Sequence, residues 1–73
     1  MLTTREVDVL ALLAQGCSYA AIGERLGISA HTVASHIKNA YRKLEVHTAA
    51  AAVMRAVQLN LFLQPGQNGG DAG

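Results

Sequence analysis

Gly27, Ile28 and Ser29 constrain the fold of this 73-residue chain more than any other segment. They separate two stretches, residues 19–26 and 30–44, whose apolar side chains recur at helical spacing. Gly27 can adopt the left-handed backbone that ends a helix, and Ser29 can cap the next one. Ile28 can fill the junction between the two helices. A connection of three residues that contains glycine makes the helices cross steeply, which is typical of a helix-turn-helix.

Two further helices are predicted around this pair. Thr3 and Glu6 form a capping-box pattern before a helix over residues 4–15, and Gly16 is a suitable stop. Ser18 caps the helix over 19–26, and a last helix spans 48–61. No stretch alternates with the period of a strand, so we expect an all-α, compact four-helix domain. The side chains expected to face the core are Val9, Leu10, Leu13, Ala14, Ile22, Leu26, Val33, Ile37, Ala40, Leu44, Val53, Ala56, Val57 and Leu61.

Composition narrows the class of protein. One cysteine, Cys17, excludes an internal disulfide and fits a reducing compartment. The longest apolar run, residues 49–54, is far shorter than the ~20 residues of a membrane span, and early charged residues interrupt any secretory signal. Residues 64–73 contain one proline and four glycines, which predicts a disordered tail after a domain over residues 1–63. We therefore expect a cytoplasmic protein with no membrane partner.

Positive charge is concentrated in residues 27–44, which contain three cationic side chains and no acidic one. On a helix turning about 100° per residue, the apolar positions of residues 30–44 fall within about 40° of one another and define a buried face. The opposite face, roughly 140–200° away, carries the basic stripe His31, Ser35, Lys38 and Arg42. The stripe is flanked by Thr32, Ala34 and Asn39, and Lys43 lies to its side.

Such a helix suits the major groove of DNA. Lys38 and Arg42 can reach phosphates or guanine edges, and Ser35 and Asn39 can pair with bases. Lys43 can anchor to the DNA backbone, and the hydroxyl of Ser18 can hold a phosphate. Thr32, in the first turn, is placed to bind a phosphate with the help of the free amides and the helix dipole. The alternative is that the stripe is only the solvent-facing side of an ordinary helix. The residues predicted to contact DNA are Ser18, His31, Thr32, Ala34, Ser35, Lys38, Asn39, Arg42 and Lys43.

The segments "LLAQG", "IGERLGIS", "HTV", "SHIKN" and "RKLEV", with "LT", Glu6 and "VL" before them, resemble the LuxR/FixJ-type (GerE-like) helix-turn-helix domain over residues 2–62. The resemblance implies a DNA-binding output domain of a bacterial transcription regulator, with 30–44 as recognition helix and 48–61 as dimerisation helix. Double-stranded DNA and RNA polymerase are the implied partners. "RKLEVHT" is more similar to the response-regulator branch of two-component systems. The chain departs from the family pattern at Ala34, where Lys is frequent, and at Glu45, where Gly is frequent.

The last helix has more apolar positions than one core-facing side needs. A second apolar face could include Ala50, Met54, Val57 and Leu61, and we favour a homodimer formed through it. The simpler interpretation is an alanine-rich helix with high intrinsic helix propensity. The alternative function is a helical protein–protein interaction module that uses the same apolar face of residues 48–61.

The histidines and the cysteine do not form a reactive site. His31 and His36 are five residues apart and point in different directions on one helix, while His47 lies in the following loop. Cys17 has no paired base. We therefore expect no cofactor, no metal site and no catalytic residue, and the chain is predicted not to be an enzyme.

Overall fold

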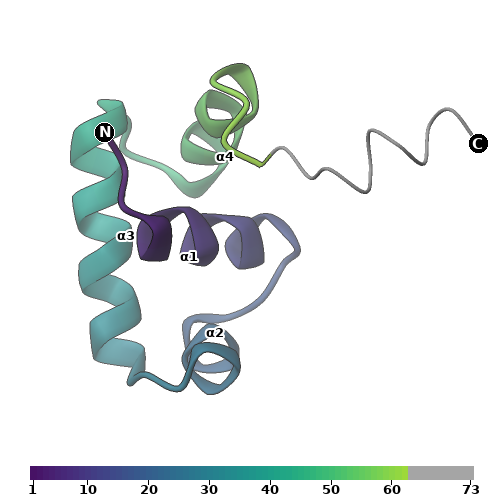
Figure 1. The fold of residues 1–73 in the computed structure, drawn as a ribbon, viewed down its shortest axis with the longest axis vertical. Helices are drawn as coiled ribbons and strands as arrows, with labels where there is room; N and C mark the ends of the chain where they lie inside the picture. The colour runs from purple at the N-terminus through teal and green to yellow at the C-terminus, as the bar shows by residue number, and fades with distance from the viewer. Residues whose placement is uncertain (63–73) are drawn as a thin grey trace, which may run out of the picture.

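The computed structural model describes residues 1–62. They form four helices: α1 Thr4–Ala14, α2 Tyr19–Leu26, α3 Ala30–Leu44 and α4 Ala49–Gln58. In Figure 1, α1 lies across the middle of α3, α2 sits near the beginning of α3, and α4 sits near its end. The described residues contain no strand, so the all-α prediction is confirmed. Residues 64–73, predicted to be a disordered tail, lie outside the described residues.

Every helix begins with the same device, a serine or threonine whose hydroxyl accepts a backbone hydrogen bond. The hydroxyls of Thr3, Ser18, Ser29 and Thr48 accept from the amides of Glu6, Ala21, Thr32 and Ala51, at 3.0–3.1 Å. At α1 the predicted capping box is present, because Glu6 Oε1 also accepts from the amide of Thr3 at 2.9 Å. Each such cap stabilises its helix by about 1 kcal/mol.

Every helix also ends in the same way, with a residue in the left-handed conformation at or just after its last turn. These residues are Gly16, Gly27, Glu45 and Asn60. The amide of the next residue then donates to a carbonyl five residues back, in the pairs Cys17–Leu12, Ile28–Gly23, Val46–Tyr41 and Leu61–Ala56, at 2.9–3.1 Å. These next residues are all half-buried against the core. Each of these motifs therefore ends a helix and also directs the apolar side chain of the following residue onto the core.

The core consists of two clusters that share α1. Val9 packs with Ile22, Val33 and Ile37 between α1, α2 and α3. The next residue, Leu10, packs with Ala40, Leu44 and Ala52 between α1, α3 and α4. The four buried residues of α3 are the four predicted from its spacing. Because Val9 and Leu10 are fully buried in different clusters, α1 joins the helix-turn-helix to α4.

Several details of the predicted helices were wrong. The last helix ends at Gln58 rather than residue 61, because Asn60 takes a left-handed conformation and turns Leu61 back onto the second cluster. The residues that α4 buries are Ala52 and Ala56, whereas Val57 is 57% exposed and does not face the core. At the other end of the fold, α1 stops one residue earlier than expected and Ala14 is exposed.

Glu45 is a non-glycine residue in the left-handed region, with φ 59°. An L-residue with a Cβ costs roughly 1–2 kcal/mol in this conformation relative to the right-handed helix, and glycine avoids most of that cost. We expect Glu45→Gly to raise the free energy of unfolding by about 0.5–1 kcal/mol, after the larger chain entropy of glycine is included. Urea unfolding measures the change. Glu45→Gln, which removes only the charge, should leave stability nearly unchanged, and a gain equal to that of Glu45→Gly would contradict the argument.

Gly23 allows α2 to approach the turn that follows it. A Cβ at this buried position would lie 2.6 Å from the carbonyl oxygen of Ile28, which is backbone and cannot move aside freely. Overpacking of about 1–3 kcal/mol should outweigh the gain of about 1 kcal/mol in helix propensity. We therefore expect Gly23→Ala to lower the free energy of unfolding, measured by urea unfolding. Glu24→Ala, at the exposed neighbouring position, serves as the control, and a Gly23→Ala domain more stable than the wild type would refute the close contact.

Candidate nucleic-acid interface

The outer face of α3 carries the predicted basic stripe. His31, Ser35, Lys38 and Arg42 are all exposed, while Val33 and Ile37 on the opposite side are buried. The flanking residues Thr32, Ala34 and Asn39 are half-buried. Since α3 contains no acidic residue, this face presents positive charge and hydrogen-bonding groups without a carboxylate of its own to repel a polyanion.

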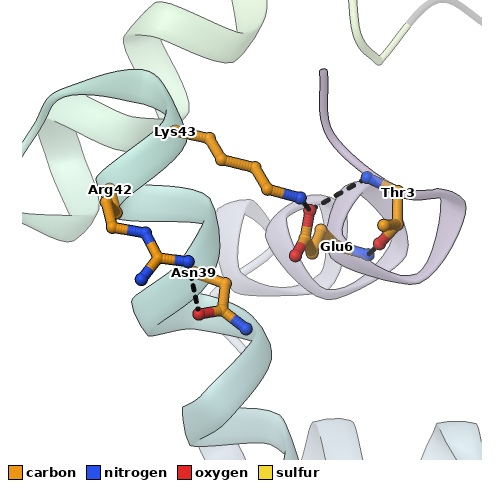
Figure 2. Close-up of polar contacts among 5 residues, drawn as sticks. All are labelled: Thr3, Glu6, Asn39, Arg42 and Lys43. Atoms are coloured by element: carbon orange, nitrogen blue, oxygen red, sulfur yellow. Dashed lines mark hydrogen bonds and ion pairs between the residues drawn. The ribbon is translucent and has the colours of Figure 1, made fainter.

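Two side-chain contacts organise the ends of this face. Nη2 of Arg42 donates to Oδ1 of Asn39 at 3.2 Å, as Figure 2 shows. This bond uses the oxygen of Asn39 and leaves its amide nitrogen as a donor. In the first turn, the hydroxyls of Ser29 and Thr32 lie 2.9 Å apart, so Thr32 belongs to the cap of α3. These contacts hold Asn39, Arg42 and Thr32 in place in the free protein.

Lys43 is directed away from the stripe. Its Nζ lies 2.9 Å from Oε1 of Glu6, whose side chain is only 4% exposed. In Figure 2 the Lys43 side chain reaches from α3 to the first turn of α1, whereas Arg42 extends along α3 toward Asn39. The structure thus separates Lys43 from Lys38 and Arg42, with which the sequence grouped it. Glu6 precedes buried Val9 and Leu10 by three and four residues, and that spacing was the signal that its carboxylate faces the core.

Opposing effects set the ionisation of Glu6. Burial alone would raise the pKa of its carboxyl group. The hydrogen bond from the Thr3 amide, together with the hydrogen bond and positive charge of Lys43, outweighs burial, so the pKa lies below its usual value. The carboxylate is therefore charged at neutral pH and links the start of α1 to the last turn of α3.

A surface hollow of ≈ 430 Å³ lies beside the stripe. It is lined by Tyr19 from α2, by Lys38, Tyr41 and Arg42 from α3, and by Val46 and His47 from the loop before α4. Ser18, the predicted phosphate ligand next to Tyr19, is exposed, and its hydroxyl oxygen caps α2. Sequence reasoning did not assign His47 to the interface, because only the tertiary fold brings its loop beside Lys38 and Arg42.

Within residues 1–62, no group of three His, Cys, Asp or Glu side chains is placed to hold a metal ion. The four helices of the described range are all too short or too polar to cross a membrane.

Comparison with known proteins identifies the fold and the family. Residues 1–56 match the family described as "Bacterial regulatory proteins, luxR family". The chain belongs to the LuxR family. Its four-helix fold agrees with a solved structure of the transcription factor GerE, with a TM-score of 0.79 and 35% identity over 82% of this chain and 90% of that one.

Relatives named as regulators support the same assignment. The LuxR-family domain is 43% identical to the transcriptional activator protein CarR of Pectobacterium carotovorum subsp. carotovorum, over 89% of this chain. It is 48% identical to the nitrate/nitrite response regulator protein NarP of Escherichia coli (strain K12), over 88% of this chain. The chain spans 27% of the length of each of these two relatives. It is thus a helix-turn-helix domain of a family of transcription regulators, which is not an enzyme class.

The Glu6–Lys43 pair generates a pH-dependent prediction. We expect Glu6→Gln to lower the free energy of unfolding at pH 7 by about 1–3 kcal/mol, because Lys43 loses a charged, largely buried partner. Because the folded pKa of Glu6 lies below the usual 4.5, this stabilisation is present above that value and is lost as pH falls through the folded pKa. Urea unfolding from pH 7 to pH 3 should show the wild type and Glu6→Gln converging. Glu24→Gln at an exposed site is the matched control, and a constant difference at all pH values would contradict the account.

Proposed function

We propose that this LuxR-family domain binds double-stranded DNA in a sequence-specific manner and regulates transcription, with α3 in the major groove. The observation that carries the proposal is the exposed basic stripe on α3, opposite fully packed Val33 and Ile37. Burial fixes the rotation of α3 about its axis, so Lys38 and Arg42 must point outward. An exposed helix face with cationic and hydroxyl side chains and no carboxylate matches the chemistry of the groove.

The stripe divides into base-reading and backbone-contacting residues. Ser35 and the free amide nitrogen of Asn39 would read base edges, and small Ala34 would let the helix approach closely. Lys38 would reach both a base edge and a backbone phosphate. Arg42, His31, Thr32 and Ser18 would contact the backbone, the last two at the amino-terminal ends of α3 and α2. Lys43 takes a different role in this proposal. Its ammonium group is held by Glu6, so it positions α3 on α1 instead of contacting a phosphate.

A homodimer on DNA would use the outer face of α4. Met54 and Val57 are 64% and 57% exposed, and Ala50 is also exposed. Leu61 is half-buried against the second cluster, so only part of its side chain would reach the partner. Leu59 is exposed and would extend the apolar surface of the interface. A two-fold dimer of this kind expects an approximately palindromic site. We further propose that the domain is the output part of a longer response regulator, because the response regulator NarP is similar to it and is longer than the matched region. RNA polymerase is a further proposed partner.

The exposed apolar side chains on α4 and just after it support a second candidate function. Met54, Val57 and Leu59 would also suit a helical module that binds a different protein through α4. An apolar contact of that kind depends weakly on salt, whereas phosphate contacts release counterions and depend on it steeply. Salt dependence therefore separates the two functions.

The test is fluorescence anisotropy with mixed-sequence duplex DNA across a salt series. With three to five phosphates contacted per domain, log K should fall against log salt with a slope of roughly −3 to −5. Lys38→Ala/Arg42→Ala should weaken binding and reduce the slope by about two. Arg25→Ala/Arg55→Ala removes the same charge from α2 and α4 and should leave the slope nearly unchanged. Equal effects of the two double variants, or no binding at low salt, would refute the proposed interface.

A further inference from the structure

The hollow beside the stripe gathers hydrogen-bond donors from three segments of the chain. Lys38 and Arg42 come from α3, Tyr19 from the first position of α2, and His47 from the loop before α4. Of its six lining residues within the described chain, none is acidic. Ammonium, guanidinium, phenol and protonated imidazole groups all donate hydrogen bonds, and the first two carry permanent positive charge. The chemistry that fits this set is an oxyanion.

His47 is held at the edge of the hollow by both of its neighbours in the chain. The preceding residue, Val46, packs against the second core cluster, and its amide donates to the carbonyl of Tyr41 at 3.0 Å. The following residue, Thr48, caps α4 by accepting from the amide of Ala51 at 3.1 Å. The short loop that carries His47 therefore cannot swing freely away from Lys38 and Arg42.

We propose that this hollow seats one backbone phosphate of bound DNA, and that His47 adds a third positive charge to the seat only when it is protonated. The proposal rests on the proposed function, because Lys38 and Arg42 belong both to the hollow and to the groove-facing stripe. When α3 lies in the major groove, a backbone phosphate beside that groove is the oxyanion that Lys38 and Arg42 would bring to the hollow. DNA affinity would then depend on pH close to neutrality, where histidine changes charge.

Linkage gives the direction of this pH dependence. A phosphate in the hollow attracts the imidazolium of His47, so DNA binding favours proton uptake. The other titratable groups that line the hollow are the phenols of Tyr19 and Tyr41. Burial, and then the neighbouring Tyr19, raise the pKa of Tyr41, so this phenol keeps its proton over the range that matters.

The experiment compares anisotropy titrations of mixed-sequence duplex DNA at pH 6 and pH 8, each across a salt series. One linked proton changes affinity by at most tenfold per pH unit, and we expect the wild type to bind roughly three- to tenfold more weakly at pH 8. Its salt slope should also be shallower by about one at pH 8, because one of the three ion pairs with the phosphate is lost. His47→Gln should lose most of the pH dependence, with the shallower slope at each pH value. His47→Lys, permanently charged, should keep its pH 6 affinity at pH 8.

His36, which is half-buried and lies outside the stripe, provides the matched control. His36→Gln removes the same titratable group from another position and should leave the pH dependence largely in place. A His47→Gln domain that keeps the wild-type pH dependence, or a wild type that binds DNA equally at both pH values, would overturn the phosphate seat and leave the proposed function standing. A wild type that binds no DNA at either pH would overturn both.

Discussion

The packing of α3 on α1 is the constraint on which the rest of the structure depends. Val33 and Ile37 bury one side of α3 under Val9, and Ala40 and Leu44 continue that side under Leu10. A rotation of α3 by a single residue, about 100°, would move these side chains out of the core and turn the basic stripe away from its present face. The Glu6–Lys43 pair adds a polar contact between α1 and the carboxyl-terminal end of α3. The outward direction of Lys38 and Arg42 is thus a consequence of packing.

A domain of this size buries only a modest core, so local backbone motifs determine much of where its helices begin and end. Hydroxyl caps at the four helix starts and left-handed residues at the four helix ends define each boundary within the chain itself. The half-buried residues after each helix, such as Ile28 and Val46, connect these motifs to the core. This arrangement also fixes the start of α2, which carries Tyr19, and the loop before α4, which carries His47, beside the hollow on α3. The same motifs that end the helices therefore shape the proposed DNA-binding surface.

The features that could be predicted from the sequence are those determined by neighbouring residues. The capping box of Thr3 and Glu6, the glycine stop at Gly27 and the buried face of α3 follow from spacings within one or two turns, and they are confirmed. The contact of Lys43 with Glu6 joins residues 37 positions apart, so the sequence pattern placed Lys43 by its own helix alone. The end of α4 depended on Asn60 adopting a left-handed conformation, which asparagine tolerates but does not require. The sequence pattern likewise missed His47 as a neighbour of the stripe, because only tertiary packing brings the loop of His47 beside Lys38 and Arg42.

The central claim, that the outer face of α3 meets DNA, is tested most directly by an NMR titration of the ¹⁵N-labelled domain with a mixed-sequence duplex. Backbone amide shifts report which residues change environment without any substitution that could perturb the fold. The account predicts that the largest changes occur at His31, Ser35, Lys38 and Arg42, with further changes around Ser18 and His47. Changes confined to residues 50–58 of α4, with α3 unaffected, would contradict it, and no change at any residue would favour the protein-interaction module.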